Sequence, residues 1–254
     1  MIKAERQERI RQLVEQRGAV SVKEIAQALD VSEMTVRRDL EEMSNLGDLV
    51  RVHGGARSGG SRRQSMLRGE SRHVEKRGRN AAAKLAIARR AVSLIEPEST
   101  VFLGAGTTVE QMVPLLPKTH LRIVTNSLSV FNMLEGETHY DLFLIGGAFR
   151  ARTAAFVGPL AEEAISKVGL DIAFIGANGV CDGEVSTSNA EEGHFQKLAF
   201  DKADVRYLVA DASKLGRRDF FSFYRLNDLD GLICDDAISS TERAAVEEYT
   251  DIVL

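Results

Sequence analysis

A glycine- and threonine-rich loop that follows a predicted strand at 100–103 could hold a phosphate group. Its residues with suitable chemistry are Gly104, Gly106, Thr107 and Thr108. Glycines let a ligand come close to the backbone, and free amides at a helix N-terminus together with threonine hydroxyls can bind an oxyanion. The dinucleotide-binding pattern is incomplete because Val109 takes the place of its third glycine, and no Walker lysine follows. Taken alone, the loop fits equally a tight turn before a capped helix.

Four more polar loops follow predicted strands. They contain Thr125, Asn126 and Ser127; Gly146 and Gly147, followed by Arg150 and Arg152; Asn178; and Asp211 with Lys214. Any one of these loops is explained by turn chemistry, because Asn and Asp cap backbone amides and Gly accepts a positive φ. Five such loops at the strand ends of one sheet predict a site for a small anion that carries hydroxyl groups, such as a sugar phosphate. Lys214 and one or two arginines would supply its charge-assisted hydrogen bonds.

A parallel sheet is the element that would bring these loops together. Strands are predicted at 100–103, 121–125, 140–145, 171–175, 206–210, 231–234 and 251–254. Helices are predicted from 81 to Pro97 and near 108–116, 128–134, 159–168, 191–203 and 241–249. This mostly alternating order is typical of a parallel sheet covered by helices on both faces. In such sheets ligands bind at the carboxyl ends of the strands.

Residues near the N-terminus have the chemistry of DNA recognition. Ser32 is a natural N-cap for a helix from about Glu33 to Leu46. Its core-facing residues would be Val36, Leu40 and Met43. Early on the helix and off that stripe lie Thr35, Arg37 and Arg38. A recognition helix inserts its N-terminal part into the major groove, where Arg can donate two hydrogen bonds to guanine. By themselves, the two arginines fit a solvated helix face just as well.

The segments around this helix complete a winged helix-turn-helix. A first helix is predicted at 5–16, and Ser21 with Glu24 forms a capping box for a short second helix. After the third helix, residues 48–55 predict a hairpin wing. The wing residues expected to face DNA phosphates are Arg51 and His53.

The charge distribution divides the chain into segments. The net charge is −4, yet residues 1–60 carry net 0, residues 61–90 carry net +8 and residues 91–254 carry net −12. Residues 57–80 are rich in Arg, Gly and Ser, which predicts a basic linker that either adds nonspecific DNA affinity or is simply solvated. We therefore expect a DNA-binding domain at 1–56, this linker, and an α/β domain at 81–254.

Composition limits the class of protein further. The 254 residues are 44% hydrophobic and 28% charged, which is typical of a soluble globular protein. No stretch of 18 apolar residues is present, and the charged N-terminus does not resemble a signal peptide, so we expect a cytoplasmic protein with no membrane partner. Cys181 and Cys234 lie far apart and the histidines are scattered. We expect reduced thiols, no metal and no cofactor.

The sequence also resembles a known family. The run VSVKEIAQALDVSEMTVRRDLEEMSNLGDLVRVHGGA resembles the N-terminal domain of the DeoR family of bacterial sugar-metabolism repressors. The runs GAGTT, TNS, IGG, STSNAEE and DASKLG are similar to the effector domains of that family. The resemblance implies a fold like ribose-5-phosphate isomerase and a phosphorylated sugar as ligand. It also implies that the phosphate is held by Gly104, Gly106, Thr107 and Thr108, with Lys214 nearby.

Three longer runs resemble one subgroup of the family. FLGAGTTVEQM, SNAEEG and KLGRRDFFS look most similar to lactose phosphotransferase repressors, which respond to tagatose 6-phosphate. The linker departs from the usual family pattern because it is unusually rich in Arg and Gly. No interdomain mechanism is therefore implied by the resemblance.

The main alternative is an enzyme, a sugar-phosphate isomerase-like domain fused to a DNA-binding domain. Proton transfer between sugar carbons needs a general base, usually a carboxylate. The isomerases that the fold resembles keep acids where this chain has Asn178, and Asn cannot act as that base. Glu191 and Glu192 remain as acids. A DNA binder without a ligand is a third hypothesis, against which the polar strand-end loops argue.

We expect a DNA-binding repressor of sugar-metabolism genes rather than an enzyme. Its partners would be double-stranded operator DNA, a phosphorylated sugar that releases it from the operator, and further copies of the chain in a dimer or tetramer. The residues expected to contact DNA are Ser32, Thr35, Arg37, Arg38, Arg51 and His53. The residues expected to contact the effector are Gly104, Gly106, Thr107, Thr108, Thr125, Asn126, Gly147, Arg152, Asn178 and Lys214.

Overall fold

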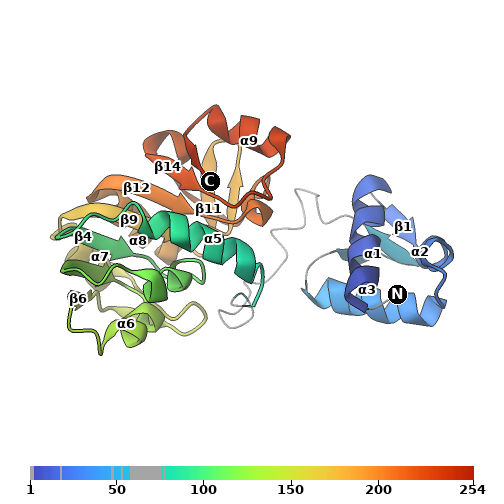
Figure 1. The fold of residues 1–254 in the computed structure, drawn as a ribbon, viewed down its shortest axis with the longest axis horizontal. Helices are drawn as coiled ribbons and strands as arrows, with labels where there is room; N and C mark the ends of the chain where they lie inside the picture. The colour runs from blue at the N-terminus through green and yellow to red at the C-terminus, as the bar shows by residue number, and fades with distance from the viewer. Residues whose placement is uncertain (1–2, 18, 47–48, 53, 58–75, 77) are drawn as a thin grey trace. The chain divides into compact units, whose positions relative to one another are not determined.

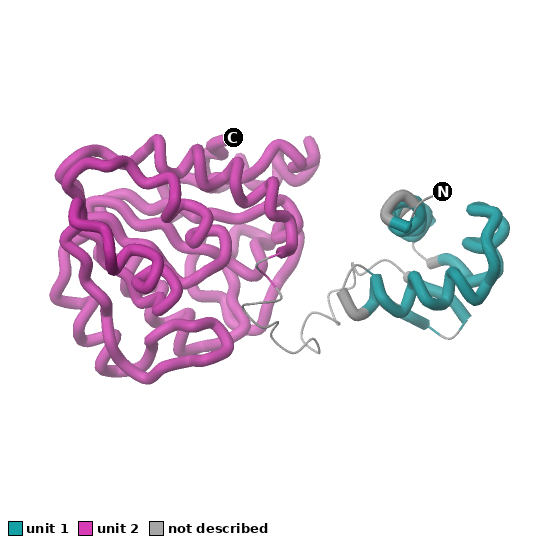
Figure 2. The backbone as a smooth tube through the Cα atoms, turned by 60° about the horizontal axis from the view of Figure 1, so that its bottom comes forward, with its two compact units in different colours: residues 1–67 teal, residues 68–254 magenta. Residues whose placement is uncertain are grey.

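The chain forms two compact units, Met1–Leu67 and Arg68–Leu254 (Figure 2). The computed structural model describes residues 3–17, 19–46, 49–52, 54–57, 76 and 78–254. His53 and most of the predicted linker at 57–80 lie outside the described residues. The predicted order of a winged helix-turn-helix followed by a mostly parallel α/β domain is confirmed.

The first unit contains three helices and a small antiparallel sheet. Its elements are α1 (Lys3–Arg17), β1 (Ala19–Ser21), α2 (Val22–Leu29), α3 (Glu33–Leu46), β2 (Val50–Val52) and β3 (Gly55–Arg57). The strand order is β1-β3-β2, so the hairpin wing pairs with the strand before α2. Gly54, at φ +82°, lies in the turn of the wing. A Cβ at Gly55 would lie 2.3 Å from the carbonyl oxygen of Val20, so only glycine allows this pairing.

Local sequence signals explain where the helices of this unit begin and which face they bury. The predicted capping box is present: Ser21 Oγ accepts from the Glu24 amide at 3.2 Å, and the Ser21 amide donates to the Glu24 carboxylate at 2.8 Å. The predicted stripe of α3, formed by Val36, Leu40 and Met43, is fully buried. It packs in one core with Ile10, Ile25 and Leu49. The opposite face of α3 is thereby left exposed.

The second unit is built on a seven-stranded sheet in which every pairing is parallel (Figure 1). The strands are β4 (Thr100–Leu103), β5 (Leu121–Thr125), β6 (Tyr140–Leu144), β9 (Leu170–Gly176), β12 (Ala203–Val209), β14 (Gly231–Ile233) and β15 (Ile252–Val253). Their order across the sheet is β15-β14-β12-β9-β4-β5-β6. The seven predicted strands therefore all occur, with ends that differ by a few residues.

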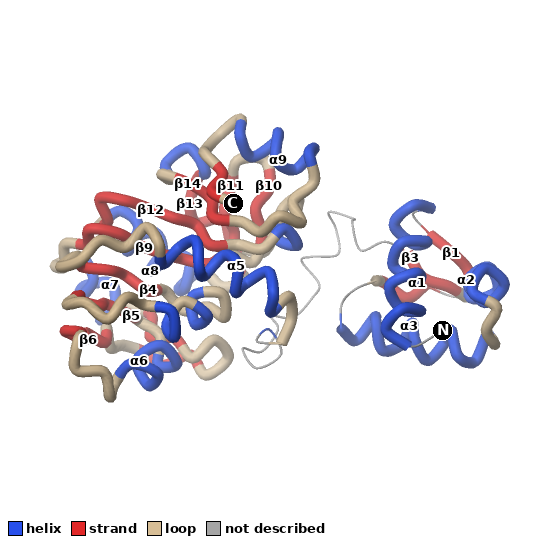
Figure 3. The backbone as a smooth tube through the Cα atoms, in the orientation of Figure 1, coloured by secondary structure: helices blue, strands red, loops and turns tan. Residues whose placement is uncertain are grey.

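Helices cover both faces of this sheet (Figure 3). They are α5 (Ala81–Val92), α6 (Leu128–Leu134), α7 (Pro159–Ser166), α8 (Ala190–Asp201) and α9 (Ser240–Glu247). Strand side chains alternate between two cores, so that Phe102 and Ala173 pack with α7 and α8 while Leu103 and Phe174 pack with α5 and α6. The central strands β4 and β9 are buried on both faces, whereas the edge strand β6 is only partly buried.

Two helix predictions differ from the structure. The segment predicted as one helix at 108–116 forms two 3₁₀ helices, η2 (Val109–Gln111) and η3 (Val113–Leu115). Pro114 has no backbone N–H, so it cannot supply a bond that a continuous α-helix requires. Helix α5 ends at Val92, well before the predicted stop at Pro97.

Short antiparallel strands were not predicted from the sequence. They are β7 (Ala148–Arg150) with β8 (Ala155–Val157), and a three-stranded sheet of β10 (Gly179–Cys181), β11 (Glu184–Thr187) and β13 (Phe221–Arg225). Two further 3₁₀ helices are η4 (Ala212–Lys214) and η5 (Leu226–Asp228). Among the described residues, no helix combines the length and apolar character needed to cross a membrane, and neither cysteine forms a disulfide.

The direction of strand addition reverses between β4 and β9. From β4 the chain proceeds outward through β5 to β6, and it then returns to β9 on the other side of β4 before continuing to β12, β14 and β15. A crevice forms at such a reversal because the loops of the two adjacent strands diverge. The polar loops after β4 and β9 flank this point.

A buried ion pair connects the first and third helices of the first unit. Arg6 Nε donates to Asp39 Oδ2 at 2.5 Å, and Arg6 Nη2 donates to Asp39 Oδ1 at 3.1 Å. The Asp39 side chain is only 2% exposed. Hydrogen bonding to Asp39 raises the pKa of Arg6 above its ordinary value.

We predict that Arg6→Met lowers the free energy of unfolding of this unit by about 3 kcal/mol, because Asp39 stays buried as a charge without its main partner. Native-state hydrogen exchange of the α3 amides measures the change. The control is Arg11→Met on the same helix, because exposed Arg11 pairs with Glu8 at the surface and such a pair contributes under about 1 kcal/mol. Equal losses in the two variants would contradict the stabilising role of the buried pair.

Candidate functional site

The predicted DNA-contacting residues of α3 lie on its exposed N-terminal surface. Ser32 caps the helix, since its Oγ accepts from the Thr35 amide at 3.2 Å and lies 2.9 Å from Thr35 Oγ1. Arg37 and Arg38 are both exposed, and Arg37 makes only a long surface ion pair with Glu33 at 3.5 Å. Arg51 is exposed on β2. The α3 surface therefore presents two guanidinium groups to solvent.

One residue of this surface was missed in the sequence analysis. Met34 lies in the first turn of α3 and is 76% exposed. Its position between the capping Ser32 and the core residue Val36 was the available signal, because an apolar side chain there cannot reach the core stripe. Apolar side chains on a recognition helix can contact the methyl group of thymine.

The loop after β4 begins exactly where the strand order reverses, and its two glycines have different surroundings. The Gly104 amide donates to the Phe174 carbonyl of β9 at 3.0 Å, and a Cβ at Gly104 would lie 3.2 Å from that oxygen. At Gly106, by contrast, a Cβ would have no described atom within 4 Å. Gly104 thus fits the loop against β9, whereas Gly106 leaves its backbone open to a ligand.

The threonines that follow are largely buried. Thr107 is 7% exposed and Thr108 is 9% exposed. The Glu110 amide donates to the Gly106 carbonyl at 3.0 Å, which starts the helical turn of η2. The amides at the beginning of that turn lie beside the open backbone of Gly106, which is the arrangement that binds oxyanions in other loops of this kind.

Three other predicted effector residues have structural partners in this structure. The Thr125 hydroxyl donates to the Leu103 carbonyl at 2.6 Å and accepts from the Ser127 amide at 3.0 Å. The Asn126 side chain donates to the Phe156 carbonyl at 3.0 Å. A Cβ at Gly147 would lie 2.7 Å from the Val157 carbonyl oxygen. These contacts shape the loops after β5 and β6. They explain why Thr125, Asn126 and Gly147 occupy these positions whether or not a ligand binds there.

A buried lysine of α5 joins the site and was not predicted. Lys84 is 4% exposed, and its Nζ donates to the Lys76 carbonyl at 2.5 Å. Burial lowers the pKa of Lys84, and the charge of Asp211 opposes that effect. The available signal was its spacing: Lys84 lies three and four residues before buried Ile87 and Ala88, hence on the inward face of the helix.

Asp211 and Lys214 form the charged part of the loop after β12. Asp211 is 2% exposed and its Oδ1 accepts from the Ser213 amide at 3.1 Å and from Asn80 Nδ2 at 2.8 Å. Burial by itself would raise the pKa of Asp211, but the charge of Lys214 and these hydrogen bonds outweigh it and hold the pKa below its usual value. Burial lowers the pKa of Lys214, with Asp211 opposing. Two partly desolvated cations thus lie near one buried carboxylate.

The loops after β9 and β6 contribute further polar groups. Asn178 Oδ1 accepts from Lys76 Nζ at 2.9 Å. Arg150 Nε donates to Glu192 Oε1 at 2.9 Å, and the Thr153 hydroxyl donates to the same oxygen. Glu192 is therefore engaged in a buried ion pair at the start of α8. Arg152 is exposed on the turn between β7 and β8.

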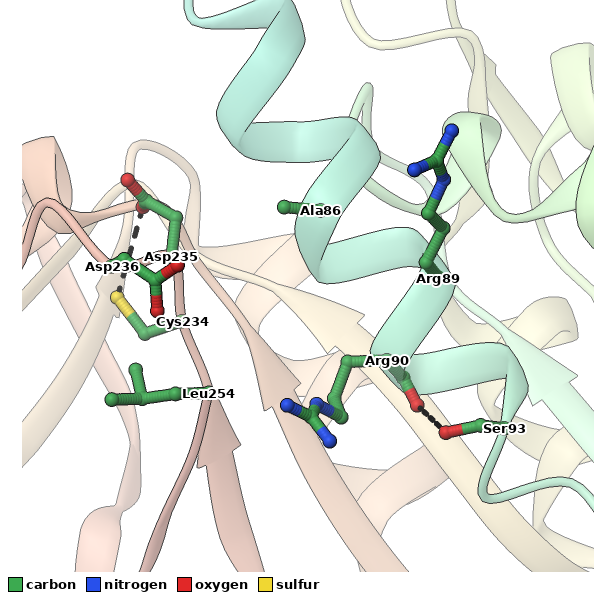
Figure 4. Close-up of a pocket in the computed structure, with 8 residues that line it drawn as sticks. All are labelled: Ala86, Arg89, Arg90, Ser93, Cys234, Asp235, Asp236 and Leu254. Carbon is green, nitrogen blue, oxygen red and sulfur yellow. Dashed lines mark hydrogen bonds between the residues drawn. The ribbon is translucent and has the colours of Figure 1, made fainter.

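A separate pocket lies between α5 and the ends of β14 and β15 (Figure 4). It is lined by Ala86, Arg89, Arg90, Ser93, Cys234, Asp235, Asp236 and Leu254. Its lining among the described residues includes none of the predicted effector residues. Asp235 connects it to the strand-end loops, since its Oδ1 accepts from the Ala212 amide at 2.8 Å. Burial and then Asp235 raise the pKa of Cys234 to about 12, so this thiol is protonated at neutral pH.

Comparison with solved structures finds weak likenesses. Ribose 5-phosphate isomerase A from Methanocaldococcus jannaschii is 18% identical, with a TM-score of 0.38 over 53% of this chain and 54% of that chain. The translation initiation factor eIF-2B of Pyrococcus horikoshii is 15% identical, with a TM-score of 0.45 over 91% of this chain and 86% of that chain.

Comparison with curated proteins and family profiles gives much stronger matches. A protein of Streptococcus mutans named lactose phosphotransferase system repressor is 40% identical over the full length of both chains. A protein of the same name from Staphylococcus aureus is 42% identical over 92% of this chain and 93% of its own length. Residues 6–62 match the DeoR-like helix-turn-helix domain, and residues 79–236 match the DeoR C terminal sensor domain. The chain belongs to the DeoR family.

Proposed function

We propose that this chain represses sugar-metabolism genes by binding operator DNA through α3 and the wing, and that a phosphorylated sugar releases it. The observation that carries the proposal is that three features occur around the carboxyl ends of the parallel strands β4 and β12. These features are the open backbone at Gly106, the buried ammonium of Lys84, and the Asp211–Lys214 loop. All are joined in one chain to a DeoR-like helix-turn-helix domain.

The charges of the site favour a phosphate as the anionic group of the ligand. Desolvation lowers the pKa of both Lys84 and Lys214, because the charged form of each side chain is less stable here than in water. A phosphate dianion would stabilise both charges and would accept from the amides beside Gly106. The polar groups of Asn178 and Arg152 lie on loops that could reach sugar hydroxyls. Names of the relatives support a sugar, and tagatose 6-phosphate is the first compound to test.

The α3 surface supports specific DNA binding. Arg37 and Arg38 project away from the buried stripe, where they can donate to guanine, and exposed Met34 adds an apolar contact. Ser32, Thr35 and Arg51 would contact phosphates. One small winged helix gives modest specificity, so we propose a two-fold homo-oligomer that reads repeated half-sites in the cytoplasm, where operator DNA is found.

We propose a regulator rather than an enzyme because the carboxylate of the site, Asp211, already accepts from Ser213 and Asn80 and is held below its usual pKa by Lys214, which makes it a poor base. Asn178 cannot abstract a proton, and Glu192 is held in its ion pair with Arg150. Glu191 is exposed. Incubating the protein with tagatose 6-phosphate or ribose 5-phosphate should therefore leave each sugar unchanged.

Gly106→Ala tests the phosphate site. We expect the added methyl group to occupy the open space beside the backbone, which would lower affinity for tagatose 6-phosphate by about tenfold or more in calorimetric titrations. Stability should change by less than about 0.5 kcal/mol, because no described atom opposes the methyl group. Gly136→Ala, which also points into open space, is the matched control. Affinity at the wild-type level in Gly106→Ala would mean that the phosphate binds elsewhere.

Arg38→Ala tests the DNA interface. We expect binding to a duplex selected from a random pool by the wild-type protein to weaken by about 1–3 kcal/mol, with a smaller loss on unrelated DNA. Fluorescence anisotropy at fixed salt measures both. The control Arg225→Ala removes the same charge from an exposed position of the second unit and should bind DNA normally. If Arg38→Ala binds the selected duplex as well as the control does, Arg38 is not in the interface.

A further inference from the structure

The residues that lead into α5 are held by the side chains of the proposed effector site. Lys76 Nζ donates to Asn178 Oδ1 at 2.9 Å, and Lys84 Nζ donates to the Lys76 carbonyl at 2.5 Å. Asn80, four residues after Lys76, donates from its Nδ2 to Asp211 Oδ1 at 2.8 Å and to Ser213 Oγ at 3.2 Å. Two points of one short segment are thus fixed to loops after β9 and β12.

Asn80 adopts an unfavourable conformation in making these contacts. Its backbone is left-handed, with φ 53° and ψ 39°, at the N-cap of a twelve-residue helix. Asparagine is a favoured N-cap because its side chain can accept from the first free amides. Here the Asn80 side chain accepts no hydrogen bond from the first amides of α5, and its Nδ2 donates to Asp211. Asn80 therefore contacts the site and does not cap the helix.

The contacts of this segment use the groups that a sugar phosphate would need. One of the three N–H donors of Lys84 is taken by the Lys76 carbonyl and is not available to a phosphate in this arrangement. Asn178 Oδ1 and Asp211 Oδ1 are acceptors for sugar hydroxyls, yet here they accept from Lys76 and Asn80. Ligand and segment therefore compete for Lys84, Asn178 and Asp211.

We propose that Lys76 and Asn80 form a latch that competes with the sugar phosphate for the effector site. This proposal rests on the proposed function of that site. The contacts described above are the closed latch, and the ligand opens it by taking over Lys84, Asn178 and Asp211. In the sequence, Lys76 and Asn80 lie on the side of α5 from which the chain continues toward the DNA-binding unit. Because closure reduces the fraction of competent sites, it weakens the apparent affinity for the ligand.

Two latch variants give the first test, in calorimetric titrations of the full chain with tagatose 6-phosphate. Lys76→Met removes the ammonium and keeps the length of the side chain. Asn80→Gly removes the bond to Asp211 and fits the left-handed backbone without strain. Each variant should bind the sugar phosphate about 3- to 10-fold more tightly, as expected from the loss of one or two competing hydrogen bonds. The control Lys118→Met makes the same change at an exposed lysine before β5 and should bind as the wild type does.

Hydrogen exchange of the wild-type protein gives the second test. The Arg79 amide donates to the Lys76 carbonyl at 3.3 Å, so its exchange reports on the closed latch. Saturating tagatose 6-phosphate should speed exchange in the peptide that covers residues 76–82. Slower exchange would mean that the segment closes over the ligand as part of the binding site, which would overturn the latch.

The outcomes separate the latch from the function of the site. Weaker or unchanged sugar phosphate binding by Lys76→Met and Asn80→Gly, with normal binding by the wild type, overturns the latch and leaves the effector site intact. If the wild-type protein binds neither tagatose 6-phosphate nor ribose 5-phosphate nor inorganic phosphate, the proposed function fails and the latch fails with it. Tighter binding together with faster exchange supports the latch.

Discussion

Two lysine ammonium groups are desolvated beside one buried carboxylate at the carboxyl ends of the parallel strands, and the rest of the second unit is arranged around that constraint. A buried cation is costly unless it is paired and hydrogen-bonded. Asp211 supplies negative charge to both Lys84 and Lys214, and it is itself kept ionised by Lys214, Ser213 and Asn80. The sheet brings the partners together from α5 and the loop after β12. The Lys84 ammonium also donates to the Lys76 carbonyl at 2.5 Å.

The residues that pack the loops into place differ from the charged residues of the site. Gly104 fits the phosphate-type loop against β9, while Thr125, Asn126 and Gly147 fix the neighbouring loops through bonds and contacts to the backbone. The first unit uses the same division. Its core and the Arg6–Asp39 pair hold one face of α3, so that the other face presents Arg37 and Arg38. In the first unit the exposed side chains are Arg37 and Arg38, and in the second the exposed backbone is that of Gly106.

Much of this arrangement follows from sequence pattern. Unbroken apolar runs alternating with helical spacing predict the parallel sheet, and the capping box at Ser21 predicts the start of α2, because both signals are local. The loop residues at strand ends were identified because a parallel sheet gathers them at one edge. Lys84 was missed because a lysine on a helix is usually solvated, and only the tertiary fold makes it buried. The partners of Asn80 and Lys76 are more than 100 residues away in the chain, at separations of 131 and 102, so no local pattern predicts them.

The central claim is that one chain couples a sugar phosphate site in the second unit to operator binding by the first. A thermodynamic cycle tests it most directly: operator affinity measured with and without saturating tagatose 6-phosphate, and tagatose 6-phosphate affinity measured with and without operator. The account predicts that each ligand weakens the other by the same factor, about 5- to 150-fold. Operator affinity that is unchanged by a sugar phosphate bound at the site would contradict it.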